Sequence, residues 1–134
     1  MAVTERSGLL LAARVVGSGL LVAMAAIHLW LWFDGYAEIP LVGPGFLVDT
    51  AAGVVLGAAV ALVSRRALAL TAALGALLMA GTLGAIVLSL TVGLFGFFDA
   101  LEAPLVPTTL VVESLGLLVL LATALQARRT PSAR

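Results

Sequence analysis

Four long apolar segments dominate this sequence, and short stretches rich in charge, glycine or proline separate them. They cover residues 15–33, 46–63, 67–98 and 105–125. A helix needs about 20 mostly apolar residues to cross the hydrocarbon core of a bilayer, and helices satisfy their own backbone hydrogen bonds there. We therefore predict an all-α membrane protein with four transmembrane helices. The third segment is longer than one crossing requires, so it is expected to tilt or to extend beyond the core.

The composition supports a membrane environment. Only 10% of the 134 residues are charged, whereas a soluble domain has about 25%. With 63% hydrophobic residues, a soluble domain of this size has too little interior to bury its apolar surface. We predict one integral membrane domain, residues 1–134, that is surrounded by the lipid bilayer. The net charge of zero argues against a nucleic-acid partner, and the absence of cysteine excludes disulfides and thiolate metal ligands.

The charged residues predict the orientation of the helices. All seven basic residues are arginines, and they precede the first segment, separate the second from the third, or follow the fourth: Arg6, Arg14, Arg65, Arg66, Arg128, Arg129 and Arg134. The other two connections are acidic: Asp34, Glu38, Asp99 and Glu102. Because cytoplasmic connections are enriched in Lys and Arg, we expect both termini to be cytoplasmic. The exclusive use of Arg, with abundant Ala, Val, Leu and Gly, indicates a GC-rich bacterium and hence its plasma (inner) membrane.

The two acidic connections share a sequence pattern. "FDGYAEIPLVGP" (residues 33–44) and "FDALEAPLVP" (residues 98–107) both read Phe-Asp, then Glu-x-Pro-Leu-Val, then Pro, if two one-residue gaps are allowed. Hydropathy alone makes any two membrane hairpins look alike, but it does not explain the shared acids and prolines. The pattern predicts two tandem duplicated helical hairpins, residues 1–66 and 67–134, related by a pseudo-twofold axis along the membrane normal.

Three ionisable residues lie inside the apolar segments: His28, Asp49 and Glu113. Such residues are costly in lipid and usually face the bundle interior or a cavity. Asp49 and Glu113 are equivalent in the two halves, whereas the equivalent of His28 is Gly93. Small residues four apart also flank the acid of the second segment, at Gly53 and Gly57, and these let helices approach closely. We expect the three side chains to meet, with His28 pairing with an acid from another helix.

Several roles are open for this trio. It is either a hydrogen-bonded knot that fixes helix packing, or a ligand or proton site near the outer face, since histidine titrates near neutral pH. One histidine and two carboxylates suit a hard or borderline cation, but their spacing matches no metal signature, so no metal or cofactor is predicted. No nucleophile elbow, phosphate-binding loop or dinucleotide fingerprint is present, and no enzyme activity is predicted.

Aromatic residues gather at the predicted outer end of the segments. The cluster that we single out consists of Trp30, Trp32, Tyr36, Phe95 and Phe97. Trp and Tyr favour membrane interfaces, but normally at both faces. The cluster is therefore either a one-sided interfacial belt or the lining of an outer pocket or partner surface. Gly81, Ala85, Ser89 and Gly93 form a second stripe of small residues, which we expect to pack against another helix.

The stretch "HLWLWFDGYAEIPLVGPGFLVDTAAG" (residues 28–53) resembles uncharacterised four-helix membrane proteins of actinobacteria. The four-helix plan, with arginine before the first segment and glycine in the second, loosely resembles DoxX-like small bacterial membrane proteins. The likeness is strongest over the first two segments, and no diagnostic DoxX motif is present, so no residue role follows from it. DoxX-like proteins are associated with respiratory or redox membrane complexes, and the resemblance therefore implies an accessory subunit.

Two functions follow from the sequence. The first is a non-enzymatic accessory or scaffold subunit that packs against other membrane proteins or against itself, as the small-residue stripes suggest. The alternative is a small transporter or proton-coupled carrier that uses His28, Asp49 and Glu113. A cavity that reaches the three residues favours transport, whereas a dry packed knot favours the scaffold.

The predicted orientation is testable because the wild-type chain has no cysteine. Ala37→Cys and Ala103→Cys should react with a membrane-impermeant thiol reagent in intact cells, because both acidic connections are predicted to lie outside. Ala133→Cys should react only after the cells are permeabilised. Labelling of Ala133→Cys in intact cells, with protection of the other two variants, would overturn the orientation.

Overall fold

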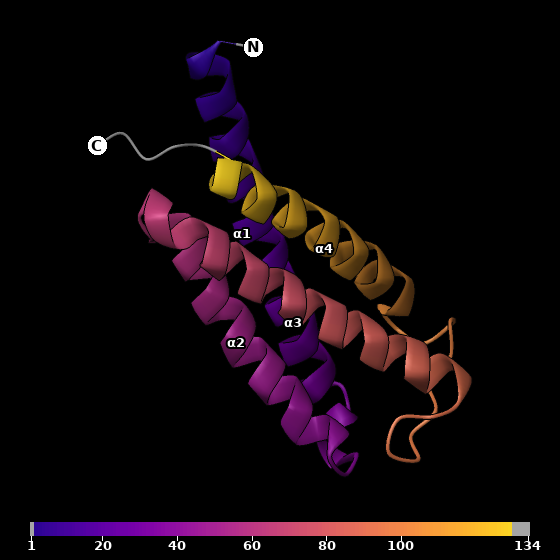
Figure 1. Cartoon of the computed structure of the whole chain (residues 1–134). Coiled ribbons are helices and arrows are strands. Elements are labelled where there is room, and N and C mark those ends of the chain that lie inside the picture. Colours follow the sequence, from indigo (N-terminus) through magenta and orange to yellow (C-terminus); the bar gives the residue numbers. More distant parts are fainter. Residues whose placement is uncertain (1, 130–134) are drawn as a thin grey trace.

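The structure is a computed structural model that describes residues 2–129, and it consists of four long helices joined by short connections (Figure 1). The elements are α1 (Val3–Phe33), the 3₁₀ helix η1 (Tyr36–Glu38), α2 (Val42–Leu62), α3 (Arg65–Thr91) and α4 (Val106–Arg129). All four α-helices are long and apolar enough to cross a membrane. Among the described residues the only extended pairing is an isolated bridge between Leu94 and Phe97. The prediction of an all-α protein with four helices that are long and apolar enough to cross a membrane is confirmed.

The four helices alternate in direction, so the connections lie at two opposite ends. The start of α1, the turn between α2 and α3, and the end of α4 lie at one end, which we call the arginine end (Figure 1). Residues 34–41 and 92–105 lie at the other, which we call the acidic end. The described arginines thus gather as the sequence predicts, while Arg134 lies outside the described residues.

The closest helix packing is within two pairs, α1 with α2 and α3 with α4. α1 also packs along α4, α3 touches α2 over a smaller area, and α2 does not contact α4 within the described chain. The shared core is formed by α1, α3 and α4 together with Val60 of α2. Its largest fully buried apolar side chains include Leu21, Met24, Leu68, Met79 and Leu120. Two tight pairs joined along one side leave α2 and α3 loosely apposed on the other.

Glycines on α2 allow its close approach to α1. A Cβ atom on Gly53 would lie 3.0 Å from the Ala25 side chain, and Gly57 is buried beside Ser18. The Ser18 hydroxyl donates a hydrogen bond of 2.7 Å to the carbonyl of Gly57. The predicted packing role of the small residues that follow Asp49 is therefore confirmed. This contact turns the Asp49 face of α2 toward α1.

Arg14 joins α1 to α2 by hydrogen bonds near the arginine end. Its Nε donates to the carbonyl of Val60 at 2.7 Å, and its Nη2 donates to the carbonyl of Val63. These carbonyls belong to the last turn and the C-cap of α2, where intrahelical partners are missing and a positive charge is favourable. Arg14 therefore does more than mark orientation, because it caps a neighbouring helix.

The helix α1 is longer than the predicted span, beginning at Val3 rather than near residue 15. Its 31 residues correspond to about 46 Å at about 1.5 Å per residue, which exceeds the roughly 30 Å hydrocarbon core. The extra turns project beyond the other helices at the arginine end (Figure 1). Hydropathy marks the part that crosses the membrane, whereas the preceding Leu, Ala, Glu and Arg residues favour helix without being apolar enough to extend the span.

The third span is shorter than predicted, because α3 ends at Thr91 and not near residue 98. Gly93 and Gly96 have φ angles of +91° and +81°, which glycine adopts readily. Between them the chain turns back, and Leu94 and Phe97 exchange backbone hydrogen bonds of 2.8 and 2.9 Å. Because the side chains of this turn are apolar, hydropathy predicted that the transmembrane segment continues through it. Gly93 is therefore not a helical equivalent of His28, and the ring of Phe98 lies against it.

The two repeated Pro-Leu-Val segments do adopt the same local structure. Leu41 and Leu105 both have positive φ angles, +66° and +63°, and each directly precedes a helix, α2 or α4. Positive φ is uncommon for a residue with a side chain. Asp49 and Glu113 then occupy the same position along their helices, counted from Val42 and Val106. The span in α2 also begins earlier than residue 46, because the first helical turn tolerates proline, here Pro44.

Gly43 and Gly45 flank Pro44 in the first turn of α2 and provide a matched test. A Cβ on Gly43 would lie 2.5 Å from the carbonyl oxygen of Ala37, whereas a Cβ on Gly45 meets nothing within 4 Å. Gly43→Ala should lower the free energy of unfolding by about 1–3 kcal/mol, because backbone must move to admit the methyl group. Gly45→Ala should leave it unchanged or raise it by up to about 1 kcal/mol through helix propensity. Thermal unfolding in detergent measures both, and equal effects would contradict the packing described.

Candidate functional site

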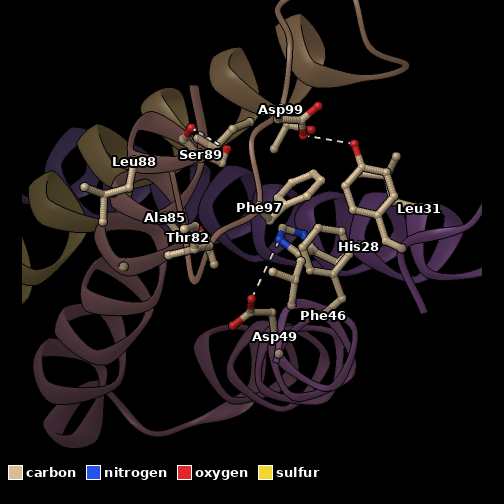
Figure 2. A pocket seen from close by; sticks show the side chains of 18 of the residues that line it. His28, Leu31, Phe46, Asp49, Thr82, Ala85, Leu88, Ser89, Phe97 and Asp99 are labelled. Atoms are coloured by element: carbon tan, nitrogen blue, oxygen red, sulfur yellow. Dashed lines mark hydrogen bonds and ion pairs between the residues drawn. The ribbon is translucent and has the colours of Figure 1, made fainter. Parts of the chain in front are cut away.

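Three helices bring His28, Asp49 and Glu113 together near the acidic end. The Nε2 atom of His28 on α1 lies 3.8 Å from Oδ2 of Asp49 on α2 and 3.8 Å from Oε1 of Glu113 on α4. Figure 2 shows Asp49 directed at the imidazole ring. His28 is 5% exposed and Glu113 is fully buried, whereas the Asp49 side chain is 28% exposed. The sequence therefore identified side chains that meet in space, and their role as a ligand or proton site remains a prediction.

The hydrogen bonds of the trio leave acceptors without donors. Nδ1 of His28 lies 2.9 Å from the carbonyl oxygen of Met24, which only accepts, so Nδ1 carries the proton in this contact. Nε2 and the two carboxyl oxygens lie too far apart for direct hydrogen bonds. Within residues 2–129, neither oxygen of Glu113 has a hydrogen-bond partner. The hydroxyl of Thr82, across the site on α3, donates to the Met79 carbonyl at 3.2 Å, and it also lies close enough to the Glu113 carboxyl to interact with it.

A cavity of about 500 Å³ opens beside the trio, between α2, α3, α4 and the connections of the acidic end. Its walls include Gly81 of α3, and Figure 2 shows Ala85 and Ser89 of the same helix beside it. We expected this stripe of small residues to pack against another helix, and within the described structure that expectation is wrong. A Cβ on Gly81 would meet nothing within 4 Å. Because α3 touches α2 only over a small area, the small side chains leave space for the cavity.

Aromatic rings form one wall of this cavity. Tyr36 stacks on Phe46 with 5.1 Å between ring centroids, Phe46 approaches the His28 ring at 4.8 Å, and Phe97 meets Tyr36 edge-on at 5.7 Å. Figure 2 shows Phe46 and Phe97 in the same part of the site as the imidazole. Two members of the predicted aromatic cluster, Tyr36 and Phe97, thus line the inner wall.

The other members of the predicted cluster lie elsewhere. Phe95 borders the cavity but is 72% exposed. Trp30 is half exposed and Trp32 contacts the ring of Phe33, and neither lines the cavity. These positions suit an interfacial belt. The two interpretations of the cluster therefore apply to different members of it.

A hydrogen bond joins the two connections of the acidic end next to the cavity. The Tyr36 hydroxyl donates to Oδ2 of Asp99 at 2.9 Å, and Figure 2 shows Asp99 at the edge of the site. Burial raises the pKa of the Tyr36 phenol, and the bond to Asp99 raises it further. The sequence patterns do not mark Asp99, Phe46 or Thr82 as site residues. The only signal for Asp99 was its place in the repeated Phe-Asp pair.

The chain matches no protein-family model, no curated protein and no solved structure. The resemblance to DoxX-like proteins therefore stays a prediction, and the geometry itself must indicate what the site does. Within the described chain, no three His, Asp or Glu residues are arranged to hold a metal ion.

Tyr36 is the only tyrosine of the chain, so its titration can be followed directly. Its neutral form is favoured in the folded state, and the native phenol should ionise at a higher pH than in the denaturant-unfolded chain, where the pKa is about 10. The stabilisation is complete below that unfolded pKa and is lost as the pH rises through the folded pKa. Ultraviolet difference titration measures both states.

Asp99→Asn is the control for this titration, because it keeps an acceptor and removes the charge. It should move the native titration part of the way back toward the unfolded value, since burial of the ring remains. Coincident titrations of the native and the unfolded wild-type chain would contradict the bond between the two connections.

Proposed function

We propose that this membrane protein binds a small ligand in its cavity and acts as a small transporter or proton-coupled carrier. His28, Asp49 and Glu113 are the residues that carry the ligand or proton. The observation that supports this proposal most directly is the cavity of about 500 Å³ that reaches all three side chains. A structural knot of polar residues in lipid is expected to be packed and internally hydrogen-bonded, whereas this trio lines a cavity and neither oxygen of Glu113 has a hydrogen-bond partner among the described residues.

The proposed orientation places both termini in the cytoplasm and the acidic end outside, in a bacterial plasma membrane. The gathering of the described arginines at one end supports it. We also propose that the two hairpins arose by tandem duplication. The matching positive φ angles of Leu41 and Leu105, and the matching positions of Asp49 and Glu113, support that origin. Duplication would explain how two acids on different helices approach the same atom of one histidine.

An accessory or scaffold role in a membrane complex is the second candidate. One observation favours it: Gly81 and Gly84 on α3 are exposed, and nothing lies within 4 Å of a Cβ built on either. Exposed glycines allow a helix of another membrane protein to approach closely. The two candidates differ in what occupies the space beside α3, a small molecule or a partner helix.

A cavity-filling substitution separates these candidates. Ala85 lines the cavity, whereas Ala26 is exposed on α1 and lies outside it. Native mass spectrometry of protein extracted in mild detergent should detect a small molecule bound to the wild type and to Ala26→Leu. Its occupancy should fall at least about tenfold in Ala85→Leu, because a larger side chain removes the volume that the ligand needs.

The same measurement can overturn the proposal. A small molecule retained equally by Ala85→Leu and the wild type would place its binding outside the cavity. A polypeptide partner, with no small molecule in any of the three preparations, would favour the accessory role instead.

A further inference from the structure

No direct hydrogen bond joins the three side chains of the trio to one another. With Nδ1 of His28 bonded to Met24, Nε2 of the singly protonated ring is an acceptor. It faces one carboxyl oxygen of Asp49 and one of Glu113, each at 3.8 Å. Both oxygens of Glu113 are fully buried and unpartnered among the described residues. A buried acceptor of this kind is costly unless something in the cavity donates to it.

The ionisable residues that line the cavity indicate the charge of the ligand that it binds. Apart from His28 and Tyr36, the ionisable residues that line it are all acidic: Asp49, Asp99 and Glu113. No arginine lines it, and the described arginines lie at the opposite end. A cation that carries several N–H donors satisfies both requirements, because a primary ammonium group has three N–H bonds and forms charge-assisted hydrogen bonds with carboxylates.

The other residues that line the cavity indicate the chemical character of the rest of the ligand. The ring of Phe46 lies against the imidazole, and the rings of Tyr36 and Phe97 continue this wall. Aromatic faces attract organic cations. Leu31, Val42 and other apolar side chains complete the lining. These walls favour an ammonium group on an apolar body over a hydrated metal ion.

The entry route follows from the loose contact between α2 and α3. A second hollow shares Asp49, Gly81, Thr82 and Ala85 with the cavity and continues along this seam. It is bordered farther along by Leu74 and Leu77, which are 45% and 69% exposed on the lipid-facing surface. Gly81 has no side chain to obstruct the junction of the two hollows. A ligand that partitions into the bilayer therefore has a lateral path to the trio.

We propose that the cavity binds a lipophilic primary amine in its ammonium form, which enters from the bilayer between α2 and α3 and donates hydrogen bonds to His28, Asp49 and Glu113. This inference rests on the proposed function, because it names the ligand class of the same cavity. Three N–H donors meet three acceptors, and the apolar body lies against the aromatic wall.

Three probes of similar body separate charge from hydrogen bonding. Phenylbutylamine has both, phenylbutyltrimethylammonium has charge without N–H donors, and phenylbutanol has a donor without charge. Calorimetric titration into wild-type protein in nanodiscs should give the amine at least about tenfold higher affinity than either of the other probes. Glu113→Gln keeps the shape of the side chain and removes its charge, and it should reduce the amine's affinity at least about tenfold while leaving that of phenylbutanol unchanged.

Several results overturn the assignment. Equal affinities for the amine and the alcohol, or no effect of Glu113→Gln, would show that the carboxyl does not recognise a cation. Equal affinities for the amine and the trimethylammonium probe would exclude recognition through N–H donors. If either result is found while Ala85→Leu still displaces the co-purified small molecule, the ligand class is wrong and the proposed function stands. If Ala85→Leu displaces nothing, the proposed function fails as well.

The lateral route has its own matched pair of variants. Gly81→Leu places a side chain at the junction of the two hollows, whereas Ala73→Leu adds the same side chain on an exposed face of α3 outside both. Surface plasmon resonance on immobilised nanodiscs should show amine association at least about tenfold slower for Gly81→Leu, and near the wild-type rate for Ala73→Leu. Equal association rates for the two variants would overturn entry through this seam.

Discussion

Polar atoms within a bilayer have no water to bond, and this constraint explains most of the arrangement described. The backbone satisfies it by forming helices. The hydroxyls of Ser18, Thr109 and Thr123 satisfy it by donating to nearby carbonyls, and Nδ1 of His28 does so through Met24. The carboxyl of Glu113 is fully buried and is the described group that breaks this pattern. This exception points to the site, because the other fully buried side-chain polar atoms of the described residues have hydrogen-bond partners.

The site depends on unequal packing between the helices. Gly53 and Gly57 let α1 and α2 approach until backbone and side chains touch, and Arg14 closes the far end of that pair. On the opposite side of the bundle, the equally small Gly81 and Ala85 face space rather than a helix. The same residue types therefore produce a tight contact in one place and a cavity in another. The difference is whether a neighbouring helix lies close enough to contact the small residues.

The two hairpins share their helix starts but not their acidic-end connections. Asp49 and Glu113 follow matching Pro-Leu-Val segments and reach the histidine from two sides. The connection after α1 is short, whereas α3 ends early and leaves residues 92–105 to form a longer one. That longer connection supplies Phe97 and Asp99, and Asp99 bonds to Tyr36 of the first connection. The longer connection thus forms part of the cavity wall. Two hairpins with identical connections would lack this part.

The sequence by itself determined that the chain forms four helices long and apolar enough to cross a membrane, because the length and hydropathy of its segments specify them. It also identified His28, Asp49 and Glu113, since an ionisable residue in an apolar segment needs a partner wherever it lies. It did not locate the end of α3, because Leu94 and Phe97 are as apolar in a glycine turn as in a helix. Nor did it distinguish Gly53, which packs, from Gly81, which borders a cavity. Only the tertiary structure decided those points, because packing depends on the distance between helices, and no property of either helix alone fixes that distance.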